Sequence, residues 1–483
     1  MSPTDTTPNL PGNFEEVDAG LEENHGSGIL RKRKRTPLMK NILCRSERLD
    51  GVMKYSIDRR EFLRSSLAGM GACALVTGCG GAASITITDA GSEAVSLPIW
   101  VPSGSDAIRT VVTRNTFLSQ NGNLPGWSQF FGKIVDDYSG GVFNPYWGPL
   151  GAMVFHGGGH SATFDNSVVI LDMNDLTFKR LSNPTPSNGG MYWLPVTGEF
   201  QGTDPAFDQV HCEYGDGQPG AGHTYDTLAI LPPADGGAPC GSLIRVASFA
   251  VHVNLSANTG WAHRFDFQST AMRDGKWTRW STNGPSSYLF PGACSAYDSL
   301  RKRIWWISGL SSAPPFIRYL DVATQRQTEL GIAIPSGLAP AADPDSVTMR
   351  YEPRRDILIL TCTVNQKMVL AFLRCDQPEK GWTTPPLSQS IQAATNTAHG
   401  FDLVPDLDKF VLLTDADNLA FYDIAPPRVL TSTWSIVRRP VAGGAIPTSS
   451  VIGKRWSYVP LLRSFIWMAS STSAVVAYRP SGV

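Results

Sequence analysis

Short apolar runs recur at similar intervals along the second half of the chain. Four are easy to see, at residues 303–307, 356–360, 409–413 and 464–468. Each run is rich in Ile, Leu, Val, Phe or Trp and follows a turn-like step, which is the pattern of a β-strand. No sustained apolar stripe of helical period follows residue 80. The body of the chain is therefore predicted to be all-β.

An aromatic residue followed by turn-forming residues marks each repeat unit. This marker occurs six times, at intervals of about 50 to 80 residues, at Phe143, Tyr225, Tyr297, Tyr351, Phe401 and Tyr458. A further strand in many units ends in an apolar or aromatic residue followed by Asp, as at Leu320-Asp321 and Tyr422-Asp423. A repeat of this length indicates stacked supersecondary units rather than two packed sheets, because a β-sandwich has no such period.

These units resemble the blades of kelch-type and galactose-oxidase-like β-propellers. A single blade cannot bury both of its faces, so blades stack radially around a channel. We expect residues 97–483 to form a kelch-like propeller of six or seven four-stranded blades. Residues 97–118 contain a strand-like run and are expected to complete the C-terminal blade, so that the two ends of the domain close the ring.

The first part of the chain carries a targeting signal. The paired Arg59 and Arg60 are followed by Phe62 and Leu63, and then by an apolar stretch that ends near Val76. The twin-arginine translocon reads this order of residues, and the apolar stretch is too short to span a bilayer permanently. The sequence therefore predicts export by the twin-arginine translocon.

The signal ends in Val76-Thr77-Gly78-Cys79, which resembles the lipobox of bacterial lipoproteins. That resemblance implies a lipid on Cys79 and a protein anchored on the periplasmic or cell-surface side of a membrane. Cleavage without lipidation is the alternative. We expect residues 1–52 to be a disordered extension ahead of the true start, 53–78 a signal peptide and 79–96 a linker.

Charge and cysteine content limit the possible partners and cross-links. The 41 Lys and Arg residues nearly balance 42 Asp and Glu residues, so no overall field attracts nucleic acid, and no such partner is expected. An odd number of cysteines in the body excludes complete pairing. The body contains Cys212, Cys240, Cys294, Cys362 and Cys375, and buried free thiols are expected for most of these five.

Two polar segments stand out in the first half of the body. Residues 156–166 include three consecutive glycines followed by His160 and, six residues later, Asn166. Residues 220–226 include His223 and Tyr225. Consecutive glycines let the backbone turn tightly and approach another group closely.

These two segments resemble those of the propeller polysaccharide lyases that include the ulvan lyases. The resemblance implies β-elimination on a uronate polysaccharide, with His160 and Tyr225 as the catalytic pair and Tyr225 as both base and acid. Arg245 is the nearest candidate to bind the substrate carboxylate, and His223 and Asn166 are expected to line the substrate site. Such chemistry needs neutralisation of a carboxylate and a base near the adjacent carbon, and no cofactor is expected.

Other interpretations of the same residues remain open. The glycines are also turn-formers and Tyr225 is also a core aromatic, in which case the propeller is a non-catalytic binding scaffold. Trp147, Trp261 and the pair Tyr192-Trp193 would then suit stacking on sugar rings. His211 and Cys212 with His223 match no strong zinc spacing. A copper-radical oxidase is disfavoured because the body contains no Tyr-His step.

Overall fold

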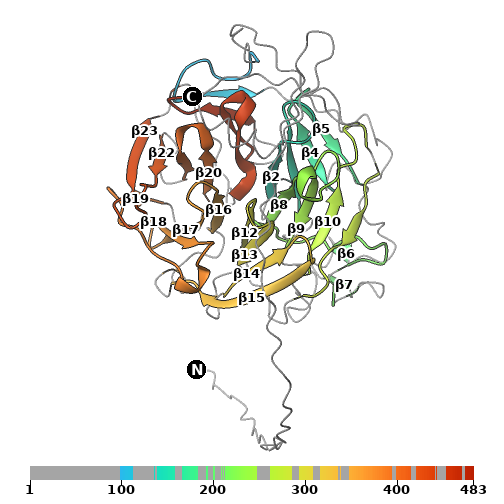
Figure 1. Ribbon diagram of the computed structural model, residues 1–483. Helices are drawn as coiled ribbons and strands as arrows, with labels where there is room; N and C mark the ends of the chain where they lie inside the picture. Colours follow the sequence, from blue (N-terminus) through green and yellow to red (C-terminus); the bar gives the residue numbers. More distant parts are fainter. Residues whose placement is uncertain are drawn as a thin grey trace, which may run out of the picture. The chain divides into compact units, whose positions relative to one another are not determined.

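The computed structural model shows an all-β domain of six four-stranded sheets arranged as the blades of a propeller (Figure 1). It describes residues 98–111, 139–157, 166–182, 213–246, 261–272, 274–284, 293–307, 316–335, 347–393, 399–414, 420–440, 453–469 and 474–483, with the shorter stretches 135, 192–193, 200–201, 208, 210–211, 338 and 442. The predicted fold class is confirmed, with six blades. The extension, the signal peptide and the linker lie outside the described residues.

Each of the first five blades consists of consecutive antiparallel strands. Blade 1 contains β2 (Gly140–Asn144), β3 (Ala152–His156), β4 (Val169–Asp172) and β5 (Thr177–Arg180). Blade 2 contains β8 (Leu228–Leu231), β9 (Ser242–Arg245), β10 (His263–Asp266) and β11 (Trp277–Arg279). Blade 3 contains β12 (Cys294–Asp298), β13 (Arg303–Ile307), β14 (Phe316–Asp321) and β15 (Arg326–Ala333).

Blade 4 contains β16 (Thr348–Glu352), β17 (Ile357–Val364), β18 (Lys367–Arg374) and β19 (Ile391–Gln392). Blade 5 contains β20 (Gly400–Val404), β21 (Lys409–Leu413), β22 (Ala420–Ala425) and β23 (Ser435–Pro440). The short sheet of β6 (Tyr192–Trp193) and β7 (Phe200–Gln201) lies in the insertion between blades 1 and 2. Short 3-10 turns occupy η2 (Pro233–Asp235), η5 (Pro378–Lys380), η6 (Pro405–Leu407), η8 (Gly453–Arg455) and η9 (Pro460–Leu462).

Blade 6 closes the ring with strands from both ends of the domain. Its inner strands are β24 (Trp456–Val459), β25 (Ser464–Trp467) and β26 (Val475–Arg479), and its outer strand is β1 (Ala107–Val111). The closing strand pairs antiparallel with β26 along its whole length, from Ala107 opposite Arg479 to Val111 opposite Val475. The expected closure by the segment 97–118 is therefore confirmed.

Six hydrophobic clusters hold the ring, one between each pair of neighbouring blades. Strand β25 shows how one strand serves two of them. Phe465 and Trp467 pack in the cluster shared with blade 5, whereas Ile466 packs in the cluster shared with blade 1. Because successive side chains of a strand point to opposite faces, a blade covered on both sides needs apolar residues at every position. This explains the continuous apolar runs in the sequence.

The aromatic marker is equivalent in only four of the six units. Phe143, Tyr297 and Tyr351 each occupy the fourth position of an inner strand, and Tyr458 occupies the matching place in β24. Tyr225 precedes its inner strand β8, and the residue in β20 that matches the marker is Leu403 rather than Phe401. The predicted equivalence of Tyr225 and Phe401 with the other markers is wrong, since spacing along the chain does not fix strand register.

The direction of the strands defines two faces of the propeller. We call the end at which inner strands begin the entry face, and the end at which they turn back the turn face. The segments after β3 and β9 and before β8 lie on the entry face, as does the insertion between blades 1 and 2. The chain enters β1 from the turn face, since Ala107 pairs with the end of β26.

The part of the chain that the structure describes contains no helix with the length and hydrophobicity of a membrane span.

Candidate functional site

Tyr225 and His223 form a buried polar pair at the entry face. The Tyr225 hydroxyl lies 2.9 Å from His223 Nδ1, within hydrogen-bond distance, and the two rings meet edge to face. Tyr225 is 4% exposed and His223 is 5% exposed. A tyrosine hydroxyl hydrogen-bonded to an imidazole has a partner that can take or return its proton.

A tight turn holds Tyr225 in an unusual backbone conformation. Thr227 N donates to Thr224 O at 2.8 Å, which closes a turn over residues 224–227. Within it Tyr225 has a φ of 40°, in the left-handed region that a bulky residue rarely adopts. Such a conformation costs about 1–3 kcal/mol and persists only where the surroundings enforce it. Gly140 is one such neighbour, because a Cβ there would lie 2.2 Å from Tyr225 O.

The glycine-rich segment approaches the second polar segment directly. Gly157 has a φ of 138°, and a Cβ there would lie 2.5 Å from Thr224 Oγ1 and 2.9 Å from Gly222 O. Thr224 Oγ1 also donates to His156 O at 2.6 Å. Asn166, at the far end of the same segment, donates from Nδ2 to Pro219 O at 3.0 Å. The close approach expected from the glycines is therefore seen at Gly157, which lies against Gly222 and Thr224.

Arg245 reaches the same segment from blade 2. Its Nη1 donates to Gly220 O at 2.7 Å and lies 3.2 Å from His156 Nε2. His156 Nδ1 lies 3.3 Å from Ser167 O, so the proton of a neutral ring belongs on Nδ1 and Nε2 accepts from Arg245. Burial, together with the Arg245 charge, holds the pKa of His156 well below its usual value. His156 is thus a neutral acceptor that orients the guanidinium.

A second ionic group joins the insertion to blade 2. Glu213 Oε1 accepts from Arg279 Nε at 2.8 Å and lies 3.0 Å from His263 Nε2. Burial raises the pKa of Glu213, but the hydrogen bonds from His263 and Arg279 outweigh burial and hold that pKa below its usual value. Burial lowers the pKa of His263 despite the Glu213 carboxylate. The pair therefore anchors the insertion over the entry face.

The structure brings the described members of the predicted site to one segment, residues 219–225. Tyr225 and His223 belong to it, and Asn166 and Arg245 bind its backbone. His160 lies outside the described residues.

Sequence reasoning missed His156, Glu213, His263 and Arg279 as members of this region. His156 directly precedes the glycines and was a detectable signal, whereas no motif links Glu213 to His263, which lies 50 residues further along the chain.

Two of the aromatic residues expected to bind sugars have packing roles. Trp147 is fully buried, and its indole Nε1 donates to Asp172 Oδ2 at 2.8 Å, so its assignment as an exposed stacking residue is wrong. Trp261 is partly exposed beside His211, with ring centroids 4.5 Å apart, and Arg279 lies over its ring. Trp261 thus keeps a partly accessible surface on the entry face.

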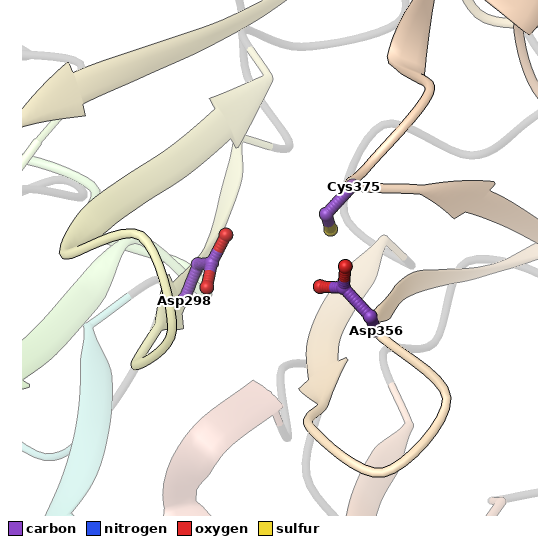
Figure 2. Close-up of side chains that lie close together, drawn as sticks. All are labelled: Asp298, Asp356 and Cys375. Carbon is purple, nitrogen blue, oxygen red and sulfur yellow. The ribbon is translucent and has the colours of Figure 1, made fainter. Parts of the chain in front are cut away.

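A separate cluster on the turn face resembles a metal site in composition only. Figure 2 shows Asp298, Asp356 and Cys375 directed toward one another from blades 3 and 4, and their ligand atoms lie within 4.8 Å of one another. Arg301 already supplies the positive charge, donating to both oxygens of Asp356 and to Asp298 Oδ2. The group is therefore an ionic link between two blades. Cys375 is a buried free thiol, as expected, and so are Cys294 and Cys362. Cys240 is also buried.

Comparison with known proteins adds little to this geometry. No protein-family model and no curated protein matches the chain. Among solved structures, the domain is similar to an arginine-to-alanine triple mutant of AofleA from Arthrobotrys oligospora, with a TM-score of 0.40 and 9% sequence identity over 72% of this chain and 80% of that chain. The blades themselves define the class, a six-bladed β-propeller.

Proposed function

We propose that the entry face of this propeller acts on an anionic polysaccharide as a uronate lyase, with Tyr225 as the group that moves the proton. The observation that carries the proposal is the contact between the Tyr225 hydroxyl and His223 Nδ1 at 2.9 Å. Arg245 and Asn166 bind the same segment, and His160 follows three residues after Gly157, which approaches it. These contacts support a role for Tyr225 and His223 in proton transfer and for Arg245 in binding the substrate carboxylate.

The residues supply each part of a β-elimination. His223 accepts the hydroxyl proton of Tyr225, and the phenolate oxygen takes the proton from the carbon next to the substrate carboxylate. Arg245 and His160 stabilise the negative charge on that carboxylate. The electron pair left on carbon forms a double bond as the bond to the leaving oxygen breaks. The leaving oxygen then takes the proton from the Tyr225 hydroxyl, and His223 returns its proton to the phenolate. Both side chains thereby regain their starting protonation states, and the reaction needs no cofactor.

A second candidate function is a carbohydrate-binding scaffold without catalysis. The burial of Tyr225 favours it, since this residue packs in the cluster that joins blades 5 and 6 together with Trp456 and Trp467. In this alternative Tyr225 and His223 shape the floor of the entry face. Trp261 and Arg279 would contact the sugar at its edge, through ring stacking and a hydrogen bond from the guanidinium.

Absorbance of the unsaturated product separates the two functions. We expect the purified protein, incubated with a panel of uronate-containing polysaccharides, to generate an absorbing double bond with at least one of them. Neutral polysaccharides lack the acidic carbon-bound proton and serve as the matched control. Binding to a uronate polymer without any rise in absorbance would leave the scaffold as the function.

We further propose that the protein is exported by the twin-arginine translocon and held on the membrane by a lipid on Cys79. The topology supports this arrangement, because the chain enters β1 from the turn face, opposite the candidate site. A site on the entry face would then point away from the membrane toward polymeric substrates.

Membrane attachment is predicted to depend on one thiol. Cys79→Ser removes the lipid acceptor, so the exported protein should move from the membrane fraction to the soluble fraction after detergent partition. Cys240→Ser, which alters a buried cysteine of the body, is the control and should stay with the membrane. Unchanged membrane association of the Cys79→Ser protein would rule out this anchor.

A further inference from the structure

Asp226, the residue after Tyr225, is the centre of a buried ionic group at the propeller axis. It is 1% exposed. Its Oδ2 accepts from Arg350 Nη1 at 2.7 Å and from Met349 N at 3.0 Å, both in blade 4. Its backbone N and O pair with Ala293 and Ser295 of blade 3. One residue of blade 2 is thus tied to two other blades.

Lys454 completes this group from blade 6. Its Nζ lies 2.9 Å from Asp226 O, 2.6 Å from Leu228 O, and 2.7 Å and 3.1 Å from the backbone and side-chain oxygens of Ser295. An ammonium has three protons to donate, so four oxygens at these distances satisfy it fully. Burial lowers the pKa of Lys454 to about 8, although the Asp226 charge opposes that change.

The ionic group adjoins the strained turn. Tyr225 takes its left-handed φ of 40° one residue before Asp226, and Lys454 binds the carbonyl oxygens of Asp226 and Leu228. Contacts to residues 226 and 228 limit rotation of the backbone on the C-terminal side of Tyr225. Thr224, with its contacts to Gly140 and His156, limits it on the other side. The turn is therefore held at both ends.

We propose that Lys454 and Arg350 are positioning residues, which act through Asp226 to keep the Tyr225 hydroxyl against His223. The inference rests on the proposed function for its catalytic consequence, but the geometry it describes does not need turnover to be measured. Lys454 and Arg350 touch no substrate in this scheme. Their role is to maintain the turn that places the proton-transfer pair.

The test is the variant Lys454→Met, which keeps the length of the side chain and removes its charge. We expect kcat to fall by about 10-fold or more while KM changes by less than about 3-fold, because the hydroxyl is misplaced and the binding surface is kept. The matched control is Lys409→Met. That lysine is also buried and binds Asp423 and Ser481 O on the turn face, so its loss should leave kcat unchanged.

A second readout is independent of activity. In protein labelled with ¹⁵N-histidine, the Nδ1 signal of His223, assigned with His223→Gln, reports the contact with the Tyr225 hydroxyl. We expect this signal to move in Lys454→Met and to stay in place in Lys409→Met, even if the unmodified protein cleaves nothing. An unmoved His223 signal in Lys454→Met, or equal shifts in both variants, would overturn the proposal. If Lys454→Met does not fold, Arg350→Met is judged by the same two readouts.

Discussion

Tyr225→Phe is expected to reduce eliminative cleavage by about 100-fold to 10,000-fold, the range over which a positioned proton-transfer group contributes. The substitution removes one oxygen atom and keeps the ring that packs against blades 5 and 6. Loss of the contact with His223 should cost about 1 kcal/mol of unfolding free energy, so the fold should survive. Binding of the polysaccharide should stay within about 2-fold, because the change acts on the transition state.

Tyr297→Phe provides the matched control. Its hydroxyl donates to Asp235 Oδ2 at 2.7 Å on the turn face, so the same atom is removed from a similar hydrogen bond far from the site. Cleavage by Tyr297→Phe should equal that of the unmodified protein. Steady-state kinetics with the polysaccharide that gives an absorbing product measures both variants. Full activity in Tyr225→Phe would show that Tyr225 is a core residue.

The sequence predicted the architecture well because a propeller repeats one local pattern. The composition of runs such as 464–468 indicates strands. The requirement that the ring must close predicted the pairing of β1 with β26. Register was harder to predict. Phe401 looks like the marker in blade 5, yet the turn there begins two residues later, since the strand β20 extends to Val404. Hydrogen bonding between strands, rather than the spacing of aromatic residues, sets that register.

The sequence named Tyr225, His223, Asn166 and Arg245 as candidates, but it did not give the contacts that join distant segments. His223 and Tyr225 lie two positions apart, so their contact was accessible to pattern reasoning. The pairs Arg245 with His156 and His263 with Glu213 join segments 89 and 50 residues apart, and only the assembled blades bring them together. Trp147 was wrongly predicted to be exposed. An aromatic residue near an insertion looks exposed in the sequence, but in the fold a neighbouring sheet covers it.

Acid is expected to destabilise the propeller before its carboxylates titrate. His156, His263 and His399 are each buried, and burial lowers the pKa of each, to about 3 for His399. These rings stay neutral in the folded protein but bind a proton in the unfolded chain below about pH 6.5. As the pH falls below the pKa of the histidine in the unfolded chain, the unfolded chain binds a proton that the folded protein does not. Unfolding is therefore favoured at low pH. Each histidine should therefore contribute up to about 1.4 kcal/mol of lost unfolding free energy per pH unit.

Urea unfolding at pH 7.5, 6.5, 5.5 and 5.0 measures this loss. The free energy of unfolding should change little between pH 7.5 and pH 7. Below pH 6.5 it should fall with decreasing pH at a rate that corresponds to the uptake of up to about three protons on unfolding. His399→Gln tests the assignment in blade 5, away from the candidate site, where the ring contacts Thr361 and Thr348. This variant should be less stable at pH 7.5 because its packing is altered. Its free energy of unfolding should nevertheless depend less steeply on pH, by about one proton. An unchanged slope in His399→Gln would mean that this imidazole is not held neutral by its surroundings. Urea unfolding of His156→Gln at the same pH values tests whether His156 is neutral in the folded protein. Its contact requires this, because a protonated His156 could not accept from the Arg245 guanidinium.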